Sequence, residues 1–130
     1  MHSILFVCVG NACRSQMAEG FARYYGPQDL VVYSAGSAPL GFVVGEAIEV
    51  MREKGIDISR RHSKGLEEIP DLEFDVAVLM GCGDACPMAR ARQKIEWEIP
   101  DPVGEPVAVF RKTRNLIERK VQRLLKDLGP

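Results

Sequence analysis

The sequence predicts an α/β fold of three layers, in which helices cover both faces of a central sheet of four parallel strands. Two observations predict it: short apolar runs recur along the chain, and segments with helical spacing separate them. Strands that alternate with helices form βαβ units, and the strands of such units lie parallel. The chain of 130 residues has no repeat, linker or low-complexity stretch. We therefore expect residues 1–130 to form a single domain.

Four runs predict the strands. The first is continuous and apolar and ends at Cys8, as expected of a strand that is buried on both faces. A β-branched run precedes Ser34, a third run follows a connection that contains proline, and a fourth ends before Pro100. The expected strands span residues 4–7, 30–33, 74–80 and 95–99.

Three segments predict the helices. Ser15 is a suitable N-cap residue for the first helix, and Gly26-Pro27 ends it. Gly55 suits the C-terminal cap of the second. In the third, apolar residues recur at steps of three, four or seven, which places them on one face. The expected helices span residues 16–25, 44–54 and 107–128.

The candidate functional residues follow the ends of the predicted strands. Binding sites in folds of this kind lie beyond the carboxyl ends of the strands. Each predicted strand has a residue with useful chemistry at or just past that end, namely Cys8, Ser34, Cys82 and Asp101. We therefore expect these four residues to lie along one edge of the sheet.

The composition excludes several classes of partner. The formal net charge is -1 and the pI is about 6.1, so the charge balance gives no reason to expect nucleic acid. The N-terminus lacks a basic region, and its apolar run is too short for a signal peptide or a membrane span. We expect a cytoplasmic monomer that binds no membrane. In the cytosol, the four cysteines favour catalysis or metal binding over a structural disulfide framework.

The loop after the first predicted strand has the composition of an anion site. Successive backbone N–H groups in such a loop can point at one anion, and the start of the next helix adds further donors. An arginine adds a planar fork that pairs two oxyanion oxygens, which lysine cannot do. In this positive field a cysteine ionises readily, and the thiolate is the attacking form. The loop consists of Cys8, Val9, Gly10, Asn11, Ala12, Cys13, Arg14 and Ser15.

A buried structural cysteine followed by an ordinary loop is the alternative interpretation of Cys8. The five-residue gap between Cys8 and Arg14, the Gly10-Asn11 turn and the position of Ser15 favour the catalytic interpretation. A Walker-type loop is excluded, because no Gly-Lys-Ser or Gly-Lys-Thr sequence occurs. The sequence therefore predicts that Cys8 acts as a nucleophile on a tetrahedral oxyanion.

The run Cys8-Val-Gly-Asn-Ala-Cys-Arg-Ser-Gln-Met-Ala-Glu19 resembles the signature of the low-molecular-weight protein tyrosine phosphatase fold. The segments Tyr33-Ser34-Ala35-Gly36 and Asp101-Pro102 match that family as well. The resemblance spans essentially the whole chain, and it implies a fold like that of the low-molecular-weight phosphatases.

The resemblance also implies roles for single residues. Cys8 would be the nucleophile, Arg14 the oxyanion clamp and Asp101 the general acid. Asn11 would hold the shape of the loop through Ser34, and Glu19 would support the loop from the first helix.

Cys82 and Cys86 distinguish between activities of this fold. A phosphatase needs neither thiol, because water hydrolyses its phosphocysteine intermediate. Reduction of As(V) to As(III) needs two electrons, and a second thiolate that attacks the sulfur of a Cys8 adduct supplies them. Such a pair is similar to that of the thioredoxin-coupled arsenate reductases, which share the phosphatase fold.

This second resemblance implies a relay. Cys82 would attack Cys8, Cys86 would then attack Cys82, and thioredoxin would reduce the Cys82–Cys86 disulfide. The substrate would be arsenate or a phosphate-like oxyanion, and no cofactor is implied.

Two other functions stay open. A tyrosine phosphatase would act through a phosphocysteine, but Val103-Gly104 follow Asp101-Pro102 where such relatives commonly carry aromatic residues. A zinc-binding module is the other, although Arg14 would repel the metal, and we expect no metal site. Its ligands would be the four thiolates of Cys8, Cys13, Cys82 and Cys86.

Cys13 has two interpretations. It is either a small residue packed under the loop, which we favour, or a partner that pairs with Cys8 on oxidation and protects it.

Lys64 also has two interpretations. Some thioredoxin-coupled relatives bind potassium behind the anion loop, at positions that match Asn11, Glu19 and Ser34 together with an acidic residue. Lys64 corresponds to the acidic position in this sequence. Its ammonium would either replace the cation and pair with Glu19, or point to solvent.

Overall fold

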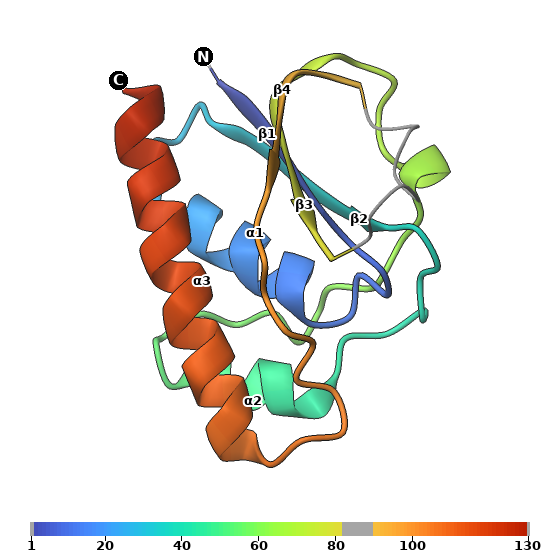
Figure 1. The fold of residues 1–130 in the computed structure, drawn as a ribbon, viewed down its shortest axis with the longest axis vertical. Helices are drawn as coiled ribbons and strands as arrows, with labels where there is room; N and C mark the ends of the chain where they lie inside the picture. Colours follow the sequence, from blue (N-terminus) through green and yellow to red (C-terminus); the bar gives the residue numbers. More distant parts are fainter. Residues whose placement is uncertain (1, 82–89, 130) are drawn as a thin grey trace.

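The computed structural model describes residues 2–81 and 90–129. Cys82 and Cys86 lie outside the described residues. The described chain forms four strands, three α-helices and one 3-10 helix, drawn in Figure 1. In chain order they are β1 (Ser3–Cys8), α1 (Arg14–Tyr25), β2 (Val31–Gly36), α2 (Gly45–Arg52), the 3-10 helix η1 (Leu66–Glu68), β3 (Phe74–Met80), β4 (Ala91–Glu96) and α3 (Val107–Leu128).

The strands form one parallel sheet in the order β2-β1-β3-β4. β1 is central, and at its end Cys8 pairs in register with Gly36 of β2 and Met80 of β3. The predicted α/β class and the four-stranded parallel sheet are therefore confirmed. The order also places the loop after β1 between two strands, where the carboxyl ends of the sheet can build a site around it.

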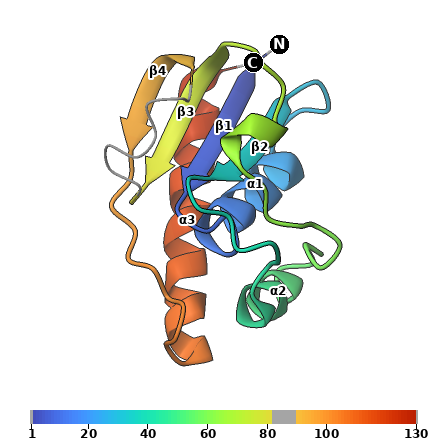
Figure 2. The same cartoon turned by 90° about the vertical axis from the view of Figure 1, so that its right-hand side faces the viewer.

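Alternate residues of β1 face opposite sides of the sheet. Ile4 and Phe6 belong to the main core, which α1 and α3 complete, whereas Leu5 and Val7 face the other side. Figure 2 shows α1 and α3 behind the sheet and η1 in front of it. After Ser3, the strand is therefore apolar at successive positions because both of its faces are covered.

The last helix closes the main core. Phe110, Ile117, Val121 and Leu124 are all buried along one face of α3, at the spacing that the sequence predicts. α3 runs the length of the molecule and packs against α1 (Figure 1). α1 begins within the predicted anion loop, residues 9–15. Burial of this face therefore fixes the helix that carries Arg14. No helix in the two described stretches is long and apolar enough to cross a membrane.

The fourth strand begins and ends earlier than the sequence indicates. β4 is an edge strand, and its Arg92, Gln93 and Lys94 are exposed. Its sequence is therefore polar and gives no apolar run. Trp97 and Ile99 follow the strand and are buried in the main core. The apolar residues in the predicted range 95–99 thus indicated burial, not strand.

Two other boundaries differ from those that the sequence predicts. α1 begins at Arg14 with Cys13 as its N-cap, and no side chain caps it, so the prediction of Ser15 as N-cap is wrong. β2 continues to Gly36, so Ser34 lies inside the strand, opposite Phe6, and not at its end.

Candidate active site

The loop between β1 and α1 turns its carbonyl groups outward. The carbonyl oxygens of Cys8, Val9 and Gly10 accept hydrogen bonds from the backbone N–H groups of residues 37, 38 and 40. The Ala12 carbonyl accepts from Val44, and the Asn11 carbonyl accepts from the side chain of Gln16. With these carbonyls engaged outside the loop, the amide groups are free to face the other way.

The amide groups of the loop are available to a ligand. Among the described residues, no acceptor pairs with the backbone N–H groups from Gly10 to Ser15. Asn11 adopts a left-handed φ of 47°, which Asn tolerates better than most residues and which bends the loop. Consecutive free N–H groups around a bend, next to a helix start, form an anion-binding concavity. This matches the oxyanion loop that the sequence predicts.

The Cys8 thiol lies at the base of the loop and has a defined polar partner. Its residue is 2% exposed, and its Sγ lies 2.9 Å from the Ser15 Oγ. The Asn11 Nδ2 donates to the same Ser15 Oγ over 2.8 Å. Because Oγ accepts from Asn11, the Ser15 hydroxyl hydrogen is free to point at sulfur. A donor aimed at sulfur stabilises the thiolate, which is the nucleophilic form.

Arg14 is buried beside the loop and is held by the segment that follows β4. Its Nη1 donates to the Ile99 carbonyl over 3.0 Å, and its Nη2 lies 3.8 Å from the Asp101 Oδ2. The Arg14 side chain is 7% exposed, whereas the Asp101 side chain is 53% exposed. The predicted clamp and the predicted general acid therefore meet at the same edge of the sheet, with the acid on the solvent side.

The cavity in front of Cys8 is small, with a volume of about 30 Å³. Pockets that take drug-sized ligands have about 300–1,000 Å³. Larger hollows of about 380 Å³ and 350 Å³ lie elsewhere, but neither contains Cys8, Arg14 or Asp101. We place the site in the small cavity because it alone of these three has a thiol beside a guanidinium. Its lining consists of Cys8, Gly10, Ala12, Cys13, Arg14, Leu40, Asp101 and Val103.

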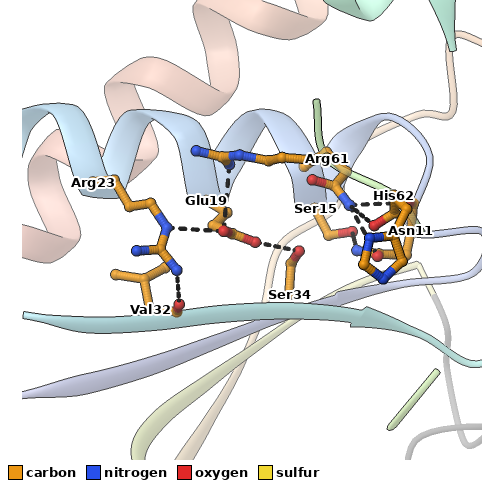
Figure 3. A network of polar contacts seen from close by, with 9 residues as sticks. Asn11, Ser15, Glu19, Arg23, Val32, Ser34, Arg61 and His62 are labelled. Carbon is orange, nitrogen blue, oxygen red and sulfur yellow. Dashed lines mark hydrogen bonds and ion pairs between the residues drawn. The ribbon is translucent and has the colours of Figure 1, made fainter. Parts of the chain in front are cut away.

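Ser34 and Glu19 form a separate contact behind the loop, shown in Figure 3. The Ser34 Oγ donates to the Glu19 Oε1 over 2.5 Å, and both residues are buried. The prediction that Asn11 holds the loop through Ser34 is wrong. Asn11 instead bonds to Ser15, while its Oδ1 accepts from Gln16 and from the Lys64 backbone N–H. Among the described residues, no hydrogen bond joins the Ser34 and Asn11 side chains.

Two arginines neutralise the Glu19 carboxylate. The Arg23 Nε lies 2.8 Å from the Glu19 Oε2, and the Arg61 Nη1 lies 3.4 Å from the same oxygen. Arg23 also donates to the Val32 carbonyl, which ties α1 to β2 (Figure 3). Among the described residues, these are the cations within 4.0 Å of Glu19. Of the two interpretations of Lys64, the one in which its ammonium pairs with Glu19 is therefore wrong.

Lys64 contributes through its backbone. Its N–H donates to Asn11, and its carbonyl accepts from the Gly36 N–H. Burial lowers the pKa of its half-buried ammonium, whereas the Glu19 charge acts in the opposite direction. Gln16, whose Nε2 also donates to the His62 carbonyl, ties the same segment to α1. Segment 62–64 therefore braces the anion loop from outside.

Gln16 and Arg61 are site residues that sequence reasoning missed. Gln16 is a polar residue that is fully buried at the start of an amphipathic helix, and a polar residue in an apolar face is a usable signal. Arg61 lies in a basic run that is typical of solvent-exposed loops, so its contact with Glu19 depends on the tertiary fold.

Cys13 is a free thiol in the lining of the cavity and is 3% exposed. Burial, with the nearby Cys8, raises the pKa of its thiol above the usual range. A neutral buried thiol is a poor nucleophile. This environment fits the interpretation of Cys13 as a packing residue. Within residues 2–81 and 90–129, no three His, Cys, Asp or Glu side chains form a group that could hold a metal.

The protein is similar to named arsenate reductases along its whole length. A curated relative from Synechocystis sp., "Glutaredoxin arsenate reductase", is 39% identical over 132 residues, which cover 99% of this chain and 100% of the relative. A solved structure of "An arsenate reductase in the phosphate binding state" has a TM-score of 0.88 and 35% identity, with coverage of 99% and 100%.

The name of a third similar protein states which reductant that protein depends on. It is the solved "Corynebacterium glutamicum thioredoxin-dependent arsenate reductase", with a TM-score of 0.79 and 29% identity over 98% of this chain and 61% of that one. The resemblance to arsenate reductases of this fold is therefore confirmed. The family model for "Low molecular weight phosphotyrosine protein phosphatase" matches residues 3–130, and the chain belongs to that family.

Proposed function

We propose that this protein reduces arsenate to arsenite, with Cys8 as the nucleophile and the loop of residues 9–15 as the oxyanion site. One observation carries the proposal: Cys8, whose thiol has the Ser15 hydroxyl as its polar partner, and Arg14 line the same cavity of about 30 Å³. An inorganic oxyanion suits such a cavity better than an aryl phosphate does. The identity of about 39% with a named arsenate reductase over nearly the whole chain supports the same substrate.

The first chemical step is a substitution at arsenic. The Cys8 thiolate attacks As(V), one arsenic-bound oxygen leaves as water, and an S–As bond forms. Asp101 is the proposed proton donor to that oxygen, because it lies on the solvent side of the cavity near Arg14. The loop amides and Arg14 stabilise the charge on the remaining oxygens. Arsenic is still As(V) in this adduct.

The second step is the reduction, and we propose that Cys82 performs it. The Cys82 thiolate attacks the Cys8 sulfur, an S–S bond forms, and the electron pair of the S–As bond leaves with arsenic as As(III). Two thiolates are thereby oxidised for each arsenic reduced. Cys86 then attacks Cys82 by thiol–disulfide exchange and releases the Cys8 thiolate. Both residues follow β3 in the sequence, whose end pairs in register with Cys8, and this supports the assignment.

We propose thioredoxin as the reductant of the final disulfide. The name of the similar Corynebacterium enzyme supports it, whereas the name of the Synechocystis relative includes glutaredoxin. The thioredoxin and glutaredoxin systems differ in the thiols that they supply. Thioredoxin supplies a dithiol, whereas the glutaredoxin system uses glutathione, which has a single thiol. A dithiol attacks one sulfur of an intramolecular disulfide such as Cys82–Cys86 to form a mixed disulfide, and its own second thiol then breaks that bond and releases the reduced protein.

Phosphatase action is the second candidate, because the chain belongs to a family named for it. The loop, Cys8 and Arg14 would suffice for a phosphocysteine. Two observations disfavour aryl phosphates: the small cavity, and the Val103 side chain in its lining where an aromatic wall would contact a phenyl ring.

The test compares both reactions on one preparation. Arsenate-dependent NADPH oxidation is measured with thioredoxin and thioredoxin reductase, and separately with glutathione, glutaredoxin and glutathione reductase, beside hydrolysis of an aryl phosphate. We expect turnover with the thioredoxin system that exceeds aryl phosphate hydrolysis. Faster turnover with glutaredoxin would overturn the reductant, and predominant aryl phosphate hydrolysis would overturn the function.

Two variants connect this assay to the site. Cys8→Ser should abolish both reactions, because an alcohol does not ionise in this loop at neutral pH. Arg14→Lys should weaken the stabilisation of the oxyanion by roughly 1.5–3 kcal/mol, because lysine cannot make the bidentate contact with two oxyanion oxygens. Arg114→Lys is a matched control, because Arg114 is 7% exposed, against 6% for Arg14, and contacts Val50 and Glu53 away from the cavity. Near-normal turnover by Cys8→Ser would refute the proposed nucleophile.

A further inference from the structure

Gly81 lies directly against the guanidinium of Arg14. It follows the last residue of β3, Met80, and has a left-handed φ of 81°. A Cβ atom built on Gly81 would lie 2.6 Å from the Arg14 Nη1, and real Cβ atoms essentially never approach another atom within 3.0 Å. Any side chain at this position would therefore occupy the space that the guanidinium fills.

The guanidinium is not free to move aside. The same Nη1 donates to the Ile99 carbonyl over 3.0 Å, and the side chain is 7% exposed. A shift away from a Cβ at residue 81 would lengthen or break that hydrogen bond, and it would turn Nη2 relative to the cavity. The planar fork needs a defined orientation to bind two oxygens of one oxyanion.

We infer that Gly81 is a positioning residue for oxyanion binding: its bare Cα leaves the space in which Arg14 is held at the correct angle. This inference rests on the proposed role of Arg14 as the oxyanion clamp. Gly81 touches no substrate in this proposal and acts through Arg14. Its effect is on the strength of anion binding, beyond any effect on folding.

A structural role of the positive φ is the competing explanation, and two variants separate it. Gly55 has a φ of 77° and no atom within 4 Å of an added Cβ, so Gly55→Ala has similar backbone strain in open space. Gly81→Asn separates the two effects in the other direction. Asn tolerates a left-handed φ, so the backbone strain is small, but its Cβ still crowds Arg14. If crowding of Arg14 matters, both Gly81→Ala and Gly81→Asn should weaken anion binding, and Gly55→Ala should not.

The experiment measures the Kd of inorganic phosphate by calorimetry and the melting temperature of each variant. We expect the phosphate Kd to rise about 10- to 100-fold in both Gly81 variants, in line with the cost of misplacing a binding group by about 1 Å. Gly55→Ala should lower the melting temperature and keep the phosphate Kd within about twofold of the unmodified protein. The Kd is taken per folded molecule, so a variant that is only less stable does not imitate the expected result.

Other outcomes overturn the inference in distinguishable ways. Unchanged phosphate binding in Gly81→Ala, or restored binding in Gly81→Asn, would refute the positioning role. Arg14→Lys is measured in parallel. If Arg14→Lys weakens phosphate binding and Gly81→Ala does not, the clamp stands and only the Gly81 inference fails. If Arg14→Lys binds phosphate normally, the proposed role of Arg14 itself is wrong.

Discussion

The Cys8 sulfur and the Ser15 hydroxyl oxygen lie 2.9 Å apart, across the two ends of the anion loop. Asn11 donates to the same hydroxyl oxygen, so the arrangement forms a short chain from amide to hydroxyl to thiol. Because the hydroxyl oxygen accepts from Asn11, the Ser15 hydroxyl hydrogen is free to point at the sulfur, where negative charge is needed for attack. Ser15, which the sequence suggests as a helix cap, instead contacts the thiol of the proposed nucleophile.

This geometry predicts the effect of Ser15→Ala. A hydrogen bond to a charged group contributes roughly 1.5–3 kcal/mol, so without this donor the alkylation of Cys8 by iodoacetamide should be about tenfold slower or more. Arsenate turnover should fall in parallel. Mass spectrometry of the Cys8 peptide at fixed pH follows the reaction, with the exposed Ser59→Ala as control. Equal alkylation rates in Ser15→Ala and the unmodified protein would contradict the assignment of Ser15 as donor.

Glu19→Gln tests the buried ion pairs behind the loop. Removal of one partner of a buried ion pair costs roughly 3–5 kcal/mol, and the cost here should be lower because the Arg23 side chain is 47% exposed. We expect the free energy of unfolding to fall by about 2–3 kcal/mol in urea titrations. Glu49→Gln, an exposed change on α2, should have little effect. A Glu19 variant as stable as that control would show that the two ion pairs contribute nothing.

Because Arg23 and Arg61 already pair with Glu19, we predict that potassium changes neither the stability nor the turnover of the protein. The Glu19 carboxylate already has Arg23 and Arg61 within 4.0 Å, so a further cation would be repelled. Replacement of sodium by potassium at matched ionic strength should leave the melting temperature and the turnover unchanged. Matched ionic strength is needed because screening alone affects exposed charges. A potassium-specific rise in melting temperature would mean that a cation site exists beside Glu19 despite these arginines.

The positions of the candidate residues at the sheet edge could be predicted from sequence, whereas the contacts that support them could not. Cys8, Arg14 and Asp101 follow from strand ends and from a loop motif, which are local signals. The partners of Glu19 depend on where residues 61–64 fold over α1, and no local pattern encodes that contact. Trp97 and Ile99 are a case of the opposite kind, because their apolar side chains indicated burial correctly, whereas the strand predicted there ends at Glu96.

Glu53 predicts how stability changes in acid. It joins the end of α2 to α3 through hydrogen bonds from Arg111 and Arg114, and these lower its pKa from 4.5 to about 2. A lowered pKa means that the folded state favours the carboxylate. The stabilisation is therefore present above about pH 4.5 and is lost as the pH falls toward about 2.

The contribution of Glu53 is measured as the difference in melting temperature between the unmodified protein and the variant Glu53→Gln. Its melting temperature should lie below that of the unmodified protein at pH 7, and the gap should narrow steadily below about pH 4.5. Other carboxylates titrate in both proteins alike and cancel in the difference. A gap that stays constant down to about pH 2.5 would mean that Glu53 is not ionised preferentially in the folded protein.

The order of the proposed relay makes a prediction about Cys86→Ser. Without Cys86, the Cys82 thiolate can still attack the Cys8 sulfur and release arsenite, but nothing inside the protein then frees Cys8. The variant should complete about one turnover and stop, because Cys8 is 2% exposed and an external dithiol reaches it poorly. Peptide mapping of the stalled, alkylated protein by mass spectrometry should find Cys8 joined to Cys82. Cys13→Ser in the same background distinguishes this bond from a Cys8–Cys13 disulfide, which would disappear in that double variant. Sustained thioredoxin-dependent turnover by Cys86→Ser would refute the order Cys8, Cys82, Cys86.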